Sequence, residues 1–207
     1  MIWSILEALI IATAISFAGS VQLGPVNFGT IHTALHKNKK AAIIFGFGGS
    51  LPELLYCGLA IGSSNVISQY EGFEDYLKYL TTGVLFLFGI YLIFQKAASE
   101  YKHKSEKKGK ELWLGATFGL LNPQLYPFWL FIITYLRTNS ILENNMWPVQ
   151  VAFVVGSALG AFLLQLLVAE FTTRKREFIY LRLTKNYNKV LGAVIIAIAI
   201  FQLVINI

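Results

Sequence analysis

The sequence predicts an all-α membrane protein: six transmembrane helices arranged as two inverted three-helix repeats with Pro-broken first helices. Three observations support this fold class: an apolar composition, six long apolar stretches, and a helix-breaking Pro beside an Asn in each half. The 207 residues are 56% hydrophobic and 14% charged, whereas a soluble domain carries about 25% charged residues. Such a composition is typical of an integral membrane protein.

Each of the six apolar stretches can cross a bilayer as a helix, which takes about 20 residues. Strands of a membrane barrel alternate apolar and polar residues over about ten positions, and these runs are continuous and about twice as long. The first run lacks the basic segment of a secretory signal, so we expect it to be retained. The expected spans are Ile2–Leu23, Ala41–Gly62, Leu77–Gln95, Leu112–Leu136, Val149–Ala169 and Val190–Ile205.

Basic residues gather in alternate connections between the spans. Lys37–Lys40 follow the first span, Lys96–Lys110 the third and Arg174–Lys189 the fifth, while Lys78 and Arg137 lie in the opposite connections. The positive-inside rule places the first set in the cytoplasm. We therefore expect a multi-pass protein of the cell (inner) membrane with both termini outside the cytoplasm. The net charge of +6 is then a topology signal, and no nucleic-acid partner is expected.

The two halves of the chain follow one plan. Residues 1–95 and 111–207 each hold three spans, and residues 96–110 form a basic cytoplasmic linker between them. The first span of one half carries "LGPVN" and that of the other "LLNPQ", while the second spans carry "GFGGS" and "GSALGAF". Three spans per half make the copies enter the membrane from opposite sides. Inverted repeats of this kind are a common plan of secondary transporters.

The paired helix breaks point to a binding site. Pro25 and Pro123 each remove a backbone donor from a helix, and broken helix is tolerated at membrane depth only inside the protein or around a wet cavity. The breaks supply free carbonyls, half-helix ends and the amides of Asn27 and Asn122. Such groups can hold a small zwitterion. A packing kink is the alternative, since Pro is frequent in membrane helices.

Glu53 is the acidic residue placed deepest in a span. A charged carboxylate at mid-bilayer costs at least about 2.5–3.5 kcal/mol on insertion scales, so it is expected to face the interior and to mark function. It can serve as a proton carrier or as a counter-ion for a substrate ammonium. A structural Glu bonded to a neighbouring polar group is the third reading.

At these residues the chain resembles the lysine exporter (LysE) family of translocators, the branch with homoserine and threonine exporters. The resemblance covers nearly the whole chain. It is carried by "LGPVNFGTIHTALHKNKKAAIIFGFGGSLPELLYCGLAI" and "LWLGATFGLLNPQLYPFWLFI". The family exports amino acids, driven by protons or by the substrate gradient. Glu53 is expected to couple transport to protons, because its carboxyl lies deep in a span and can carry one. The substrate-binding residues expected from the breaks and the resemblance are Gly24, Pro25, Asn27, Asn122, Pro123 and Gln124.

The chain departs from the family pattern at three places. Glu53 stands where Asp is usual and follows Pro52, which is expected to free the Gly48 carbonyl. Gln124 stands where the family often has Lys, which removes a positive charge near the expected carboxylate site. The fourth span is rich in aromatic residues around Trp129. These departures leave the choice between basic, neutral and larger substrates open.

Other functions remain alternatives. Efflux of a metal ion or another small metabolite needs several converging ligands, and the sequence shows no metal-ligand spacing and no cofactor motif. A serine hydrolase using Ser50 would need a His within the spans, so we do not expect an enzyme. A scaffold without transport would need no wet interior. Gly156 and Gly160 allow close helix contact, either within the subunit or in a homodimer.

Overall fold

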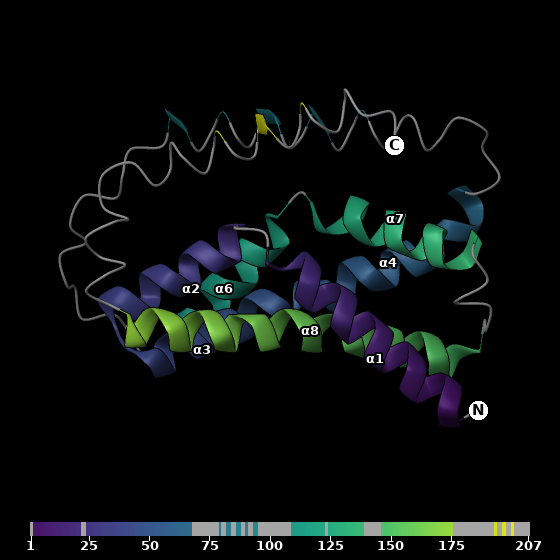
Figure 1. Ribbon diagram of the computed structural model, residues 1–207, viewed down its shortest axis with the longest axis horizontal. Helices are drawn as coiled ribbons and strands as arrows, with labels where there is room; N and C mark the ends of the chain where they lie inside the picture. The colour runs from purple at the N-terminus through teal and green to yellow at the C-terminus, as the bar shows by residue number, and fades with distance from the viewer. Residues whose placement is uncertain are drawn as a thin grey trace. The chain divides into compact units, whose positions relative to one another are not determined.

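The computed structural model describes residues 2–21, 24–67, 109–122, 124–138 and 146–175, together with isolated positions within 79–94 and 193–200. The chain divides into two compact units. One comprises Met1–Asn65 and Glu106–Arg174, and the other comprises Val66–Ser105 and Lys175–Ile207. The helices of the first unit are α1 (Ile2–Gly19), α2 (Pro25–His36), α3 (Lys39–Ser50), α4 (Pro52–Ile67), α6 (Lys110–Leu120), α7 (Leu125–Thr138) and α8 (Trp147–Arg174). Figure 1 shows these helices as a bundle.

The described elements are all helices, as predicted for an all-α membrane protein. Three of them are long and apolar enough to cross a bilayer: α1, the stretch Lys39–Ser64 formed by α3 and α4, and α8. The expected fourth span is divided between α6 and α7, each of which is shorter than a span. The expected third and sixth spans are described only at isolated positions. The count of six spans therefore stays a prediction.

The outer face of α8 shows the surface of a lipid-exposed helix. Large apolar side chains recur every four residues with 41–60% of their surface exposed: Val151, Val155, Leu159, Leu163, Leu167 and Phe171. Residues four apart lie on one helical face. The same helix buries small and polar residues on its other side, among them Ser157, Gly160 and Gln165. A helix whose exposed face is as apolar as this one, with other apolar residues such as Phe153 buried on its inner face, agrees with a membrane span.

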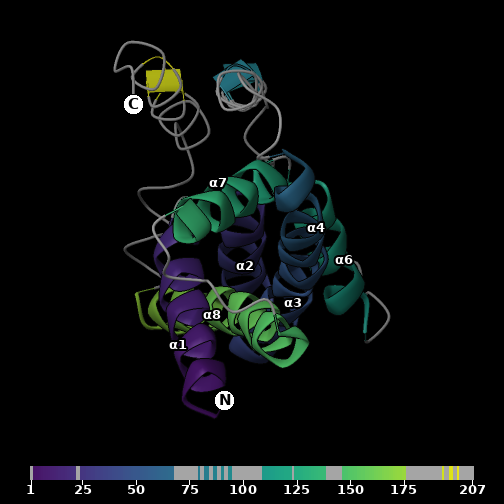
Figure 2. The ribbon, with the colours of Figure 1, turned by 90° about the vertical axis from the view of Figure 1, so that its right-hand side faces the viewer.

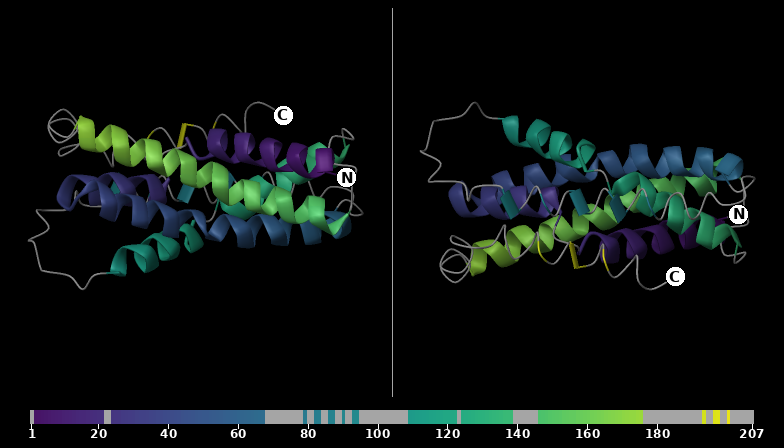
Figure 3. Two further views of the ribbon diagram at one scale, coloured as in Figure 1. Left: turned by 90° about the horizontal axis from the view of Figure 1, so that it is seen from below. Right: turned by 90° about the horizontal axis from the view of Figure 1, so that it is seen from above.

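Close glycine contacts hold two helix pairs together. A Cβ atom added at Gly160 of α8 would lie 2.2 Å from the Thr13 carbonyl oxygen of α1. A Cβ added at Gly115 of α6 would lie 2.0 Å from the Phe45 carbonyl oxygen of α3. Only glycine allows backbones to approach so closely. α1 thus packs on α8 and α6 packs on α3, so the first described helix of each half meets the third described helix of the other half, as Figures 2 and 3 show.

The Gly156–Gly160 spacing serves a contact within the subunit. A Cβ at Gly156 would lie 2.5 Å from the Leu9 carbonyl oxygen, and Gly160 meets the next turn of the same helix, α1. Of the two uses left open by the sequence, the structure therefore shows the intrasubunit contact for this pair.

Basic residues at the end of α2, the start of α3 and the end of α8 lie at one end of the bundle and are joined to acidic residues by ion pairs. Lys37 binds Glu111 of α6 at 3.1 Å, and Lys39 binds Glu170 of α8, which also binds Arg174 at 2.5 Å. A hydrogen bond from its own backbone N–H lowers the pKa of the Glu111 carboxyl, burial opposes this shift, and Lys37 lowers the pKa further. The end of α2, the first turns of α3 and α6 and the last turn of α8 thus have charged residues on the same side of the bundle.

Candidate functional site

The first helix break lies between α1 and α2. α1 ends at Gly19, and α2 begins at Pro25, whose missing N–H costs nothing at the first position of a helix. Gly24 precedes it in an extended conformation (φ −90°, ψ 178°), and its carbonyl accepts the N–H of Phe28 at 3.2 Å. The break predicted from Gly24–Pro25 is therefore present, and it directs the N-terminal end of α2 toward the interior.

The second helix break lies between α6 and α7. α6 ends at Leu120, and the backbone N–H of Asn122 donates to the Gly119 carbonyl at 3.1 Å, which closes a tight turn. The side chain of Asn122 accepts the backbone N–H of Gln124 at 3.2 Å and so shapes the turn into α7. Pro123 lies outside the described residues. The neighbours that flank it show that the helix is interrupted here, as predicted.

The turn at Pro52 differs from the prediction. The Gly48 carbonyl is not free, because the N–H of Leu51 donates to it at 3.2 Å. Leu51 itself has helical dihedral angles (φ −61°, ψ −38°). The chain therefore passes from α3 to α4 through one tightened turn rather than an open break, and Glu53 lies in the first turn of α4.

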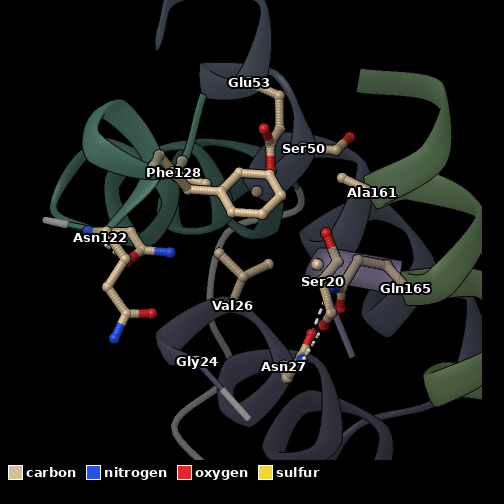
Figure 4. A pocket seen from close by; sticks show the side chains of 14 residues that line it. Ser20, Gly24, Val26, Asn27, Ser50, Glu53, Asn122, Phe128, Ala161 and Gln165 are labelled. Atoms are coloured by element: carbon tan, nitrogen blue, oxygen red, sulfur yellow. Dashed lines mark hydrogen bonds between the residues drawn. The ribbon is translucent and has the colours of Figure 1, made fainter. Parts of the chain in front are cut away.

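A pocket lies where these two breaks and the α3–α4 turn meet, and Figure 4 shows its lining. Five of the predicted site residues line it: Gly24, Asn27, Glu53, Asn122 and Gln124. Pro25 begins α2 beside it without lining it. The remaining described lining residues are Gly19, Ser20, Val26, Gly49, Ser50, Leu125, Phe128, Ala161 and Gln165.

Glu53 is the only described lining residue with a formal charge. It is 5% exposed, and the indole Nε1 of Trp129 donates to its carboxylate Oε2. Trp129 is fully buried and packs edge-on against Phe153 of α8, with ring centroids 5.8 Å apart. A buried carboxylate needs such a partner, because an unpaired one is costly in a medium of low polarity.

Polar amides form another part of the wall. The Nδ2 of Asn27 donates to the Ser20 carbonyl at 2.8 Å, and the Asn27 Oδ1 accepts from the Nε2 of Gln165. Figure 4 shows Asn27, Ser20 and Gln165 together on one side of the pocket, with Glu53 further along the wall. The pocket therefore has a carboxylate and a group of amides at separate places on its wall.

Apolar side chains complete the pocket. Phe128 of α7 reaches the end of α1, since a Cβ added at Gly19 would lie 2.5 Å from its ring. Val26 packs on Gly49 of α3 in the same way, since a Cβ added at Gly49 would lie 2.3 Å from Cγ1 of Val26. The glycines at these two places leave room for the apolar groups that separate the polar ones.

Sequence reasoning missed Gln165, Phe128 and the bond between Trp129 and Glu53. Gln165 is 3% exposed and comes from the middle of α8. The available signal was a lone amide in the apolar run "GAFLLQLLVAEF". A polar side chain inside a span faces the protein interior. Its partners lie 135 and 138 residues away in the chain, so no local pattern identifies them.

Comparison with known proteins confirms the resemblance seen in the sequence. The family model described as "LysE type translocator" matches residues 17–206. No curated protein and no solved structure matches the chain. The match includes every residue that lines the pocket, both helix breaks and the basic connections. The chain belongs to the LysE type translocator family, so the pocket lies inside a membrane transport protein.

Proposed function

We propose that this translocator exports amino acids or close derivatives from the cytoplasm, coupled to protons through Glu53. The observation that carries the proposal is the pocket in which one buried carboxylate shares a wall with amides and broken-helix ends. A membrane protein keeps such groups in its interior when a polar solute has to pass.

The pocket suggests a pose for the substrate. The ammonium group would lie by Glu53, and the carboxylate would lie toward the N-terminal end of α2, where helix N–H groups are unsatisfied and the dipole is positive. Gly24, Asn27, Asn122 and Gln124 would form the polar wall around it, while Pro25 and Pro123 keep the helices broken. Because Gln124 brings no positive charge, the helix end and the amides would hold the carboxylate.

The packing supports two inverted repeats, residues 1–95 and 111–207, joined by the linker 96–110. α1 packs on α8 and α6 packs on α3, each through glycines that meet backbone carbonyls. A two-fold relation between the halves produces such reciprocal pairs. The two breaks then occupy corresponding places, and rocking of one half against the other would expose the pocket to each side in turn.

A flux assay tests the proposed function. Purified protein in liposomes should exchange a radiolabelled amino acid against an unlabelled excess, for at least one member of a panel of basic, neutral and aromatic amino acids. Empty liposomes are the control. Movement of divalent metal ions or other metabolites in the same assay, with no amino acid moving, would show that amino-acid export is wrong.

We predict that the two ends of α8 face opposite sides of the membrane. A helix of 28 residues is about 42 Å long, enough to cross the hydrocarbon. With Cys57 replaced by Ala, an impermeant maleimide added to intact cells should label Met146→Cys and should spare Lys175→Cys. Lys175→Cys should react once the cells are opened. Equal labelling of both in intact cells would contradict the proposed orientation.

We predict that Asn122→Ala raises the KM for the exported amino acid. The substitution removes the side chain that shapes the turn before Gln124 and faces the pocket. Loss of a hydrogen bond to a charged group costs about 1.5–3 kcal/mol, which is about ten- to a hundredfold in affinity. Thr117→Ala is the control, because that hydroxyl donates to the Trp113 carbonyl of its own helix and lies outside the pocket. An unchanged KM for Asn122→Ala would leave the break as a packing kink.

A further inference from the structure

A chain of three hydrogen bonds links α8 to the break between α1 and α2. The Thr30 hydroxyl donates to Gln165 Oε1 at 2.7 Å, and Gln165 Nε2 donates to Asn27 Oδ1. Asn27 Nδ2 then donates to the Ser20 carbonyl at 2.8 Å. Thr30, Gln165 and Asn27 are each at most 3% exposed. The chain therefore lies in the core, where an unmade bond is costly.

The donor-to-acceptor direction of all three hydrogen bonds is set by the Ser20 carbonyl at one end. A backbone carbonyl can only accept, so Asn27 must turn its NH2 group toward Ser20 and its oxygen toward Gln165. Gln165 must then present its NH2 group to Asn27, which leaves its oxygen for the Thr30 hydroxyl. Each of the three side chains has one orientation that satisfies all the bonds.

Gly46 makes room for this chain. A Cβ added there would lie 2.5 Å from Cβ of Gln165 and 3.5 Å from Oγ1 of Thr30. α3 lies beside both α2 and α8, and the absence of a side chain at Gly46 lets Gln165 reach across to α2. The glycine-rich "GFGGS" segment thus has a use beyond helix packing.

We propose that Gln165 is a positioning residue for transport: it holds the Asn27 amide on the Ser20 carbonyl and so fixes the pocket wall at the first break. Gln165 lines the pocket beside Asn27 and Ser20, as Figure 4 shows. The inference rests on the proposed function, since it concerns affinity for the solute that enters this pocket. Loss of the Gln165 donor should leave Asn27 free to turn and should weaken substrate binding.

Gln165→Glu tests the donor-to-acceptor direction of these three hydrogen bonds. The carboxylate has the same shape but accepts at both oxygens, so it repels Asn27 Oδ1 and draws the Asn27 NH2 group away from Ser20. A protonated carboxyl restores the pattern, because its O–H donates to Asn27 and its other oxygen accepts from Thr30. We expect the KM of Gln165→Glu to exceed that of the parent by about ten- to a hundredfold at pH 8 and to approach the parent value as the pH falls to 5.

The measurement is equilibrium exchange in proteoliposomes with the same pH on both sides, so that no proton gradient drives transport. KM and the maximal rate are measured from pH 5 to 8 with the amino acid that the parent exchanges best, and each variant is divided by the parent at the same pH. Gln165→Leu, which has no donor at any pH, should keep a raised KM throughout.

Variants at Thr30, the other end of the three hydrogen bonds, make the test independent of Gln165 itself. Thr30→Val removes the hydroxyl that holds Gln165 and should raise KM without a pH-dependent rescue, whereas Thr30→Ser keeps the hydroxyl and should stay near the parent. Thr33→Val is the matched control on α2, because its hydroxyl donates to the Gly29 carbonyl of its own helix. It should exchange like the parent.

The outcomes separate this inference from the proposed function. If the parent exchanges no amino acid, the proposed function is wrong. If the parent does exchange one, a Gln165→Glu KM equal to that of the parent at pH 8 overturns the positioning role. A raised KM that stays equally raised at pH 5 also overturns it, since a purely structural defect has no reason to respond to protonation. If Gln165→Glu does not fold, equal KM values for Thr30→Val and Thr30→Ser overturn the role.

Discussion

Replacing Glu53 by Gln is expected to abolish accumulation of substrate against its gradient while exchange of substrate continues. Gln has nearly the shape of the protonated carboxyl and can still accept the Trp129 N–H, so the packing around it should be kept. It cannot bind or release a proton. Because Glu53 is the only charged described residue in the pocket, its loss should remove the link between proton movement and transport.

The measurement compares two modes of transport in the same proteoliposomes. An imposed pH gradient should drive the parent to build a substrate gradient and should drive none with Gln at position 53. Exchange at equal pH should persist in both, with a weaker affinity in the variant because the substrate ammonium loses its charged partner. Glu53→Asp keeps a titrating group and should retain part of the coupled activity. Coupled accumulation by Glu53→Gln would rule out Glu53 as the proton carrier.

Trp129 offers a check on the same site that leaves the carboxyl in place. Trp129→Phe keeps an aromatic ring against Phe153 but removes the N–H that donates to Glu53. A hydrogen bond to a charged group contributes about 1.5–3 kcal/mol. The proton-driven rate should therefore shift along the pH axis in Trp129→Phe, whereas it should vanish in Glu53→Gln.

The local chemistry of proline and glycine made the two breaks predictable. Pro cannot donate to a helix ladder wherever it stands, so Pro25 predicted a break or a kink at this place irrespective of the rest of the fold. The same reasoning failed at Pro52, because a single tightened turn satisfies the Gly48 carbonyl. Whether a freed carbonyl stays free depends on the turn that the neighbours adopt, which the Pro alone does not decide.

Residues whose role depends on distant partners in the chain could not be identified from the sequence. The interior position of Glu53 was predictable because a charged side chain at membrane depth faces the protein interior. Its hydrogen-bond partner Trp129 was not, because it is 76 residues away in the sequence. Gln165 was not predicted for the same reason, since the role of its amide depends on hydrogen bonds to Thr30 and Asn27 of α2. Pro123 predicted that the fourth span is broken, and α6 and α7 are separate helices, but hydropathy reports on apolar length and not on the direction that α7 takes after the break.

The glycine contacts give the other large expected effect, which is on stability. In Gly160→Ala the added methyl would lie 2.2 Å from the Thr13 carbonyl oxygen and 2.8 Å from the Phe17 backbone nitrogen. Both atoms belong to the backbone of α1, so the two helices have to move apart. In Gly115→Ala the methyl would meet the Phe45 carbonyl oxygen of α3 at 2.0 Å. Overpacking of this kind costs about 1–3 kcal/mol.

The chain supplies both a matched control and a probe for this prediction. A Cβ at Gly58 or Gly62 of α4 would meet nothing within 4 Å, and Ala favours a helix over Gly by about 1 kcal/mol. Cys57 is the lone cysteine of the chain and is fully buried, so a maleimide that fluoresces on reaction reports its exposure as the detergent-solubilised protein is heated.

We expect Gly160→Ala and Gly115→Ala each to lower Tm by about 2–12 °C, and Gly62→Ala to leave it unchanged or raise it by up to about 4 °C. Similar losses at the first two positions would follow if α1–α8 and α6–α3 are copies of one contact in two inverted repeats. A normal Tm for Gly160→Ala together with a lowered Tm for Gly62→Ala would contradict the packing of α1 on α8. A large loss at one of the two contacts and none at the other would count against their equivalence, because related contacts should tolerate the same methyl group equally badly.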